Sequence, residues 1–239
     1  MDLENVTAIV TGVSRGIGRT IAQTYVEHGA GVVGCARSEE ALESLENECG
    51  RMTGTLRTIP ANITESDDRE KVVNAAGDQF GRIDVLVNNA GLLGTRDTIA
   101  DYPMETWTKV IDANVNALFH LTQLVLAGML QHNSGRIVNI TSGVGVRGSA
   151  RWGAYAVSKF GVEGFTQVLA DELSGTNVET NAVNPGPIST DMRAEAYPEE
   201  DPETIPSPED IMDIFLYLAS EQSRGNNGKR YEAQEFRFE

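Results

Sequence analysis

The stretch SGVGVRGSARWGAYAVSK, residues 142–159, contains three side chains whose spacing predicts a reactive site. Tyr155 and Lys159 are four residues apart, so on a helix they lie on one face, one turn from each other. Ser142 directly follows residues 136–141, an apolar run that we interpret as a buried strand. Ser142 would then lie at the carboxyl end of that strand, where open α/β sheets bind their ligands.

These three side chains suit acid–base chemistry on an oxygen atom. A phenol ordinarily loses its proton near pH ~10, and a nearby ammonium group favours the phenolate and lowers that pKa. Tyr155 would then act as a general acid or base, with Ser142 hydrogen-bonded to a substrate oxygen. The pair alone favours a Tyr and a Lys that share a helix face by chance, because such pairs are common. The position of Ser142 and the motifs described below favour the site.

Length and composition indicate one soluble globular enzyme. A chain of 239 residues with 40% hydrophobic residues and 24 glycines is typical of a single α/β domain, residues 1–239. Its first residues are acidic and lack the apolar core of a signal peptide, so we expect a cytoplasmic protein. The two cysteines, Cys35 and Cys49, are expected to be free buried thiols. His28, His120 and His132 are scattered along the chain, and we assign no metal site.

The charge of the chain is strongly negative. It has 35 acidic against 19 basic residues, a net charge of −16, and an isoelectric point near 4.6. Such acidity disfavours binding to nucleic acid or to anionic membranes. A surface that is acidic and poor in lysine is typical of proteins from a high-salt cytoplasm, and we interpret the chain as halophilic. An ordinary acidic protein is the alternative.

A glycine-rich turn near the N-terminus predicts a dinucleotide site. The apolar residues 6–11 are followed by GVSRGIG at 12–18 and then by apolar residues at helical spacing. In a strand–turn–helix of this kind the backbone approaches a pyrophosphate closely, and the helix N-terminus adds positive potential. The next strand ends at Ala36, where a site for NAD usually has an acid. Arg15 and Arg37 instead suit a 2′-phosphate.

Strands and helices alternate along the whole chain, which predicts a parallel sheet with right-handed crossovers. The expected strands are residues 6–11, 32–35, 56–59, 85–87, 136–141, 178–183 and 230–233. The expected helices are the segment after the glycine-rich turn, residues 38–49, 66–80, 107–130, the segment carrying Tyr155 and Lys159, and 208–218. Residues 107–130 are amphipathic, so we interpret them as a core helix rather than a membrane span.

Two further features bear on the site. Asn114 lies on the apolar face of the 107–130 helix, where a buried amide needs partners. It would either tie that helix to a strand or hold a water molecule for proton transfer. Residues 189–207 are polar, acidic and contain prolines, and we interpret them as a substrate lid.

Taken together, these motifs resemble the classical short-chain dehydrogenase/reductase family over nearly the whole chain. The matching residues are Thr11, Gly12, Gly16, Gly18, Asn88, Asn89, Ala90, Gly91, Asn114, Ser142, Tyr155, Lys159, Pro185 and Gly186. The resemblance implies a single Rossmann-like, doubly wound, mostly parallel sheet of about seven strands flanked by helices. It also implies an oxidoreductase that transfers a hydride between NADP(H) and a carbonyl or secondary alcohol.

The resemblance assigns roles to individual residues. Tyr155 would protonate the carbonyl oxygen, Lys159 would bind the nicotinamide ribose and lower the Tyr155 pKa, Ser142 would orient the carbonyl, and Asn114 would hold a relay water. The cofactor-binding positions would be Gly12, Ser14, Arg15, Gly16, Ile17, Gly18, Arg37, Asn62, Ile63, Asn88, Ala90, Gly91, Tyr155, Lys159, Pro185, Gly186, Ile188 and Thr190. NADPH is expected to be preferred over NADH. Family members are usually homotetramers or homodimers joined through the long helices bearing Asn114 and Tyr155.

Two departures from the family pattern and several alternatives remain open. Asn62 stands where the family usually has an Asp, and the C-terminal end lacks the common Asp-Gly-Gly. The generic substrate of the nearest relatives is a 3-oxoacyl thioester, but a sugar or a small alcohol is not excluded. An acidic acyl carrier protein would meet a strongly acidic enzyme, unless Arg147, Arg151 and Arg193 receive it. The rival from another class is a non-catalytic NADP-binding regulator or scaffold, which would not be expected to retain Tyr155 and Lys159.

The charge generates a first prediction. Molar KCl should raise the melting temperature, because it shortens the Debye length to about 3 Å and removes much of the self-repulsion of a chain with a net charge of −16. Excluded solutes also strengthen apolar burial, so sucrose at matched water activity is the control. If sucrose raises the melting temperature as much as KCl does, charge screening is not the cause.

Overall fold

The computed structural model describes residues 1–238 and is built on one twisted sheet. Within those residues seven strands pair in parallel in the order β3-β2-β1-β4-β5-β6-β7. The strands are β1 Thr7–Thr11, β2 Gly31–Ala36, β3 Thr55–Pro60, β4 Val85–Asn88, β5 Gly135–Ile140, β6 Val178–Asn184 and β7 Arg230–Glu232. The expected doubly wound sheet is confirmed, and its chain order reverses between β1 and β4. Such a reversal opens a crevice at the carboxyl ends of the strands.

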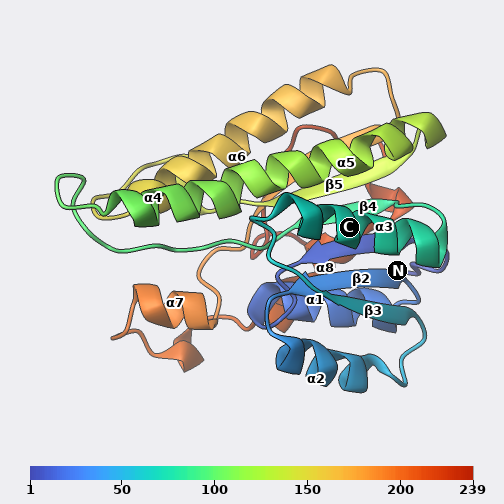
Figure 1. Cartoon of the computed structure of the whole chain (residues 1–239), viewed down its shortest axis with the longest axis horizontal. Helices are drawn as coiled ribbons and strands as arrows, with labels where there is room; N and C mark the ends of the chain where they lie inside the picture. The colour runs from blue at the N-terminus through green and yellow to red at the C-terminus, as the bar shows by residue number, and fades with distance from the viewer. Residues whose placement is uncertain (239) are drawn as a thin grey trace.

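Helices cover both faces of the sheet (Figure 1). Helices α3, α4, α5 and α6 lie on one face, and α1, α2 and α8 lie on the other. Their bounds are α1 Gly16–Glu27, α2 Glu39–Cys49, α3 Ser66–Phe80, α4 Met104–Ile111, α5 Ala117–His132, α6 Gly153–Glu172, α7 Asp191–Ala196 and α8 Met212–Ala219. Helix α7 projects away from these layers, at the lower left of Figure 1.

Apolar side chains form a core on each face of the sheet. One core joins β1 and β2 to α1, α2 and α8, and the other joins the opposite side of the sheet to α3, α5 and α6. Strands β1 and β4 are buried along their whole length, which explains why they consist of continuous apolar runs rather than alternating ones. Two buried layers hold the carboxyl ends of the central strands in fixed positions.

The helix expected at 107–130 is longer and is not a plain α-helix. It runs without a break from Met104 to His132, with a π-helical segment at Asp112–Asn116 between α4 and α5. By length and composition alone this helix could cross a membrane, but it packs on α3 and α6 as the core helix of a globular fold does. The apolar periodicity predicted a helix. It did not reveal the π-helical turn, which is defined by its backbone hydrogen bonds.

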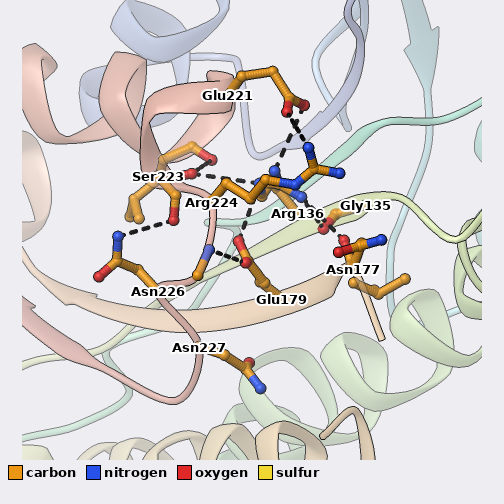
Figure 2. Close-up of polar contacts among 12 residues, drawn as sticks. Gly135, Arg136, Asn177, Glu179, Glu221, Ser223, Arg224, Asn226 and Asn227 are labelled. Atoms are coloured by element: carbon orange, nitrogen blue, oxygen red, sulfur yellow. Dashed lines mark hydrogen bonds and ion pairs between the residues drawn. The ribbon is translucent and has the colours of Figure 1, made fainter. Parts of the chain in front are cut away.

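A polar cluster lies at the amino-terminal ends of strands β5 and β6, opposite the crevice. Arg136 at the start of β5 is buried, and its guanidinium donates to the backbone oxygens of Gly135 and Asn177 and lies 3.3 Å from the carboxylate of Glu179 on β6 (Figure 2). Glu179 in turn accepts a hydrogen bond from the backbone of Gly225. This arrangement joins two strands to the C-terminal part of the chain.

The C-terminal end, which lacks the family's usual Asp-Gly-Gly, carries an aromatic cluster instead. Tyr217 and Tyr231 pack with Phe236, and Phe236 packs with Phe238, at centroid separations of 5.1–6.4 Å. Aromatic side chains at these separations contribute packing beyond their buried area. The cluster thus fixes the chain after β7 against α8.

The segment expected to be a lid, residues 189–207, has its own structure. It contains α7 and a 3₁₀ turn at Pro202–Thr204, and the backbone of Ser189 donates to Pro206 across its base. The side chain of Arg193 makes two hydrogen bonds to Glu200, at 2.5 and 2.6 Å. The segment therefore has regular secondary structure of its own and is not an extended loop. After it, Ser207 and Pro208 begin a 3₁₀ turn at Pro208–Ile211, and α8 starts only at Met212, so the first turn of the helix expected at 208–218 is 3₁₀ rather than α.

Gly18 provides a test of the packing around the glycine-rich turn. A Cβ at Gly18 would lie far inside van der Waals contact with the Asn89 side chain and the Gly12 backbone, whereas a Cβ at Gly77 in α3 would meet nothing within 4 Å. Gly18→Ala should lower the free energy of unfolding by about 1–3 kcal/mol through overpacking. Gly77→Ala should raise it by up to about 1 kcal/mol through helix propensity. Urea denaturation of both variants checks the pair, and equal effects would contradict the close approach at Gly18.

Candidate active site

A cleft of about 500 Å³ lies at the carboxyl ends of the central strands. It is lined by most of the residues that the sequence indicated, although they come from distant parts of the chain. Those residues are Gly12, Ser14, Arg15, Gly16, Ile17, Gly18, Arg37, Asn62, Ile63, Ala90, Gly91, Ser142, Tyr155, Lys159, Pro185, Gly186, Ile188 and Thr190. The sheet therefore brings the glycine-rich turn, the Tyr–Lys helix and the base of the lid segment to one site.

The glycine-rich turn is held open by hydrogen bonds from the neighbouring strand. Thr11 Oγ1 accepts from the backbone amides of Asn89 and Ala90, and Asn89 Nδ2 donates to the backbone oxygen of Thr11 at 2.8 Å. Gly12 and Gly16 adopt φ of +75° and +57°, which other residues rarely adopt. The bare backbone left by these glycines fits a pyrophosphate group. Asn89 was part of the sequence motif, but its role in bracing the turn was not predicted.

The two arginines expected near a 2′-phosphate differ in their partners. Arg15 forms an exposed ion pair with Asp191, the first residue of α7, at 2.7 Å. Arg37 lines the cleft and makes no ion pair within residues 1–238. Asn62 lines the cleft too, but its side-chain oxygen accepts hydrogen bonds from the backbone and hydroxyl of Thr64. Its acceptor is thus already engaged in supporting the loop.

Tyr155 and Lys159 lie on one face of α6, beside the end of β5. Lys159 is buried, and its Nζ donates to the backbone oxygen of Ile140 at 2.7 Å. It lies 5.5 Å from the centre of the Tyr155 ring. Ser142 follows β5, and its hydroxyl is near enough to the Tyr155 hydroxyl to lower the pKa of the phenol. The helix face and the strand end therefore bring all three side chains together, as the sequence predicted.

The pKa of Tyr155 differs from the sequence prediction. Burial raises the pKa of Tyr155 to about 12, against the lowering effect of the Ser142 hydrogen bond. The sequence led us to expect a lowered pKa, but the Lys159 ammonium is directed to Ile140 rather than to the phenol oxygen. Burial also lowers the pKa of Lys159 to about 8, and the nearby Glu163 opposes that effect. Desolvation thus dominates over the attraction between the two groups.

Asn114 sits within the π-helical segment and ties three parts of the chain together. Its Nδ2 donates to the backbone oxygen of Leu92 and to Ser158 Oγ, and its Oδ1 accepts from the backbone amide of Leu92 at 2.7 Å. Ser158 Oγ in turn donates to the backbone oxygen of Tyr155. π-helical turns are frequent at functional sites. The side chain here ties its helix to α6 and to the loop after β4 rather than to a strand, and its role in holding a relay water stays a prediction.

Asn88 differs from the other expected cofactor-binding residues. It is buried and does not line the cleft. Its Nδ2 donates to Asn139 and Thr122, so the side chain connects β4 to β5 and α5. The sequence motif gave no sign that its first asparagine is directed into the sheet.

Beside Tyr155, the cleft residue Trp152 belongs to a stack of cations and aromatic rings that the sequence did not indicate. The Trp152 ring lies 5.7 Å from the Tyr155 ring, and the Arg96 guanidinium covers Trp152 at 4.1 Å. Arg96 also donates to the backbone oxygen of Ala196 at the end of α7, and the Arg193 guanidinium lies 3.8 Å from the Tyr197 ring. These contacts hold α7 beside the reactive group. Arg96 and Trp152 are 56 positions apart in the sequence, so no local pattern pairs them.

Comparison with known proteins supports a family assignment. The family model for short chain dehydrogenases matches residues 6–201. An uncharacterized oxidoreductase, YciK, from Escherichia coli is 38% identical over 229 residues, covering 95% of this chain and 90% of that protein. A 3-oxoacyl-[acyl-carrier-protein] reductase from Thermotoga maritima is 38% identical over 233 residues, covering 93% of this chain and 94% of that protein.

Solved structures agree with this assignment. A short chain dehydrogenase from Pseudomonas syringae superposes with a TM-score of 0.93 at 39% identity, covering 97% of this chain and 96% of that one. A short chain dehydrogenase from Shigella flexneri, complexed with NADP, superposes with a TM-score of 0.88 at 38% identity, covering 97% and 98%. With the cleft, the glycine-rich turn and the Tyr–Lys helix in place, the chain belongs to the short-chain dehydrogenase family and is an oxidoreductase.

Proposed function

We propose that this protein reduces a carbonyl group to a secondary alcohol with NADPH. The observation that carries the proposal is the convergence of Ser142, Tyr155 and Lys159 on the floor of a cleft whose other end is the open glycine-rich turn. The NADP bound to the Shigella flexneri relative supports the same cofactor here. A non-catalytic NADP-binding protein would have no use for this complete acid–base group.

The residues of the cleft have distinct roles in this proposal. The glycine-rich turn would hold the pyrophosphate, Arg37 and Arg15 the 2′-phosphate, and Lys159 the nicotinamide ribose. NADPH, when bound, supplies the hydride for the carbonyl carbon. Ser142 orients the carbonyl by donating a hydrogen bond to its oxygen, and Tyr155 donates its phenolic proton to that oxygen. Positioning and charge stabilisation together lower the barrier.

The protonation of Tyr155 favours the reductive direction. With its pKa raised to about 12 by burial, the phenol keeps its proton at neutral pH. A general acid has to carry a proton before the reaction, so Tyr155 is ready for reduction and not for oxidation. Alcohol oxidation would need the phenolate and should become faster as the pH rises.

For the substrate we propose a 3-oxoacyl thioester. The support is the Thermotoga maritima reductase named above, together with an apolar substrate end formed by Leu92, Leu93 and Trp152. Arg193 is neutralised by Glu200, so of the three arginines expected to receive an acidic carrier only Arg147 and Arg151 remain. A thioester of coenzyme A, which needs no large protein contact, is the first substrate to test.

We further propose a cytoplasmic homotetramer or homodimer adapted to high salt, with residues 189–207 as its substrate lid. Phe119 on α5 and Val157, Phe160 and Val168 on α6 are about half exposed or more, which is unusual for large apolar side chains in a monomer. A second subunit covering these helices would bury them. The ion pair and backbone contacts of α7 with Arg15 and Arg96 support the lid assignment.

Tyr155→Phe tests the chemistry. Without the general acid, kcat should fall by about 10²–10⁴-fold. NADPH affinity should stay within a few fold, because the glycine-rich turn and the arginines are untouched. Reduction of a 3-oxoacyl-coenzyme A thioester, followed by cofactor absorbance, measures the first, and fluorescence titration measures the second. A folded variant with near-normal kcat would refute the role of Tyr155.

Arg37→Ala tests the cofactor preference. A charge-assisted hydrogen bond contributes about 1.5–3 kcal/mol, so NADPH should bind roughly tenfold to a hundredfold more weakly while NADH affinity changes little. Arg51→Ala, an exposed arginine outside the cleft, is the matched control. Both cofactors are titrated at one fixed salt concentration. An equal loss for NADH and NADPH would mean that Arg37 does not contact the 2′-phosphate.

A further inference from the structure

A buried carboxylate lies behind the catalytic lysine, and the mechanism above gives it no role. Glu163 is on α6, four residues after Lys159, and only 7% of it is exposed. Its Oε1 accepts a hydrogen bond from Thr141 Oγ1 at 2.6 Å and another from Arg230 Nε at 2.9 Å. Tyr155, Lys159 and Glu163 follow one another at single-turn intervals along one face of the helix.

The partners of Glu163 belong to the strand end that carries the site. Thr141 lies between Ile140, whose backbone oxygen accepts from Lys159, and Ser142, whose hydroxyl lowers the pKa of Tyr155. The hydrogen bond from Thr141 to Glu163 therefore fixes the segment on which two of the three reactive side chains depend. Removing it would let the Ile140 carbonyl and the Ser142 hydroxyl move relative to α6.

Glu163 is also the acidic group that acts on the Lys159 ammonium from its own helix. Arg230 on β7 is the opposing cation, and it is shared with Glu232 on the same strand. Thr141, which follows β5 and donates to Glu163, is uncharged. Burial alone lowers the pKa of Lys159, and the negative charge of Glu163 raises it back towards its ordinary value.

We propose that Glu163 is a positioning residue that keeps Lys159 protonated and holds the end of β5 in register with α6. The proposal rests on the proposed function, because it assigns Glu163 a task only if charged Lys159 serves the reaction. A purely structural role of Glu163 predicts that its loss would not lower the pKa of Lys159. If Glu163 only filled space, its loss would loosen the site, admit water and raise the Lys159 pKa. Loss of its charge lowers that pKa instead.

The chain is well suited to a direct test, because it contains only four lysines, at positions 71, 109, 159 and 229. Their side chains can be followed individually by NMR titration of protein labelled with ¹³C in the lysines, and Lys159→Met assigns the signal. In the wild type Lys159 should titrate near pH 8. In Glu163→Gln its midpoint should fall by about one pH unit, the size expected for an opposite charge one helical turn away.

Glu179→Gln is the matched control. Glu179 is equally buried and equally paired with an arginine, but it lies at the amino edge of the sheet (Figure 2). Its strand neighbour Arg136 is the second residue of β5 and lies four residues before Ile140, about 13 Å away along the strand. This variant should leave the Lys159 midpoint unchanged. A Lys159 shift as large as that in Glu163→Gln would overturn the proposal.

Arg230→Gln is a second variant with the opposite expected sign. Removing the cation from the carboxylate leaves more of the negative charge acting on Lys159, so the midpoint should rise. An unchanged or raised midpoint in Glu163→Gln, or a lowered one in Arg230→Gln, would contradict the proposal.

Activity gives the second readout. Charged Lys159 is lost as the pH rises through its pKa, so the alkaline decline of kcat should begin at lower pH in Glu163→Gln and at higher pH in Arg230→Gln. An enzyme whose lysine midpoints shift as stated but whose kcat profile does not would contradict the catalytic part of the proposal. If the wild type reduced no carbonyl substrate, the proposed function would fail while the NMR titration still decided whether Glu163 controls the charge of Lys159.

Discussion

The hydrogen bond from the buried Lys159 ammonium to the Ile140 carbonyl is the contact on which the site depends. It joins α6 to the carboxyl end of β5, and it orients a charge that burial would otherwise disfavour. The cost of burying that charge explains why polar residues gather around it in an otherwise apolar region. Thr141, Glu163 and Arg230 continue the same network towards the edge of the sheet.

Much of the fold was predictable because a parallel sheet buries its strands on both faces. Continuous apolar runs located the strands, and amphipathic spacing located the helices between them. The exact bounds were less certain: the helix expected at 107–130 begins at Met104, ends at His132 and contains a π-helical turn. The π-helical turn is defined by backbone hydrogen bonds, which the apolar pattern does not report.

The candidate site, too, has residues that local sequence patterns predicted and residues that they did not. Ser142, Tyr155 and Lys159 were predictable because helix periodicity and a strand end fix their relative positions. Asn88 was expected at the cofactor, yet as the last residue of β4 it bonds to Asn139 and Thr122, because successive residues of a strand face opposite sides of the sheet. The Arg96–Trp152 stack and the Arg15–Asp191 pair depend on how distant loops meet, which no local pattern records.

The strand order also has a consequence for how the protein is made. The first 88 residues already contain β3, β2, β1 and β4, four neighbouring strands with the glycine-rich turn between them. Ribosomes release the N-terminal part first, and domains begin to fold as their chain emerges. Half of the sheet can therefore pair before Ser142 and Tyr155 have been synthesised. The reactive residues are then added to a template that is already in place, and β7 closes the edge last.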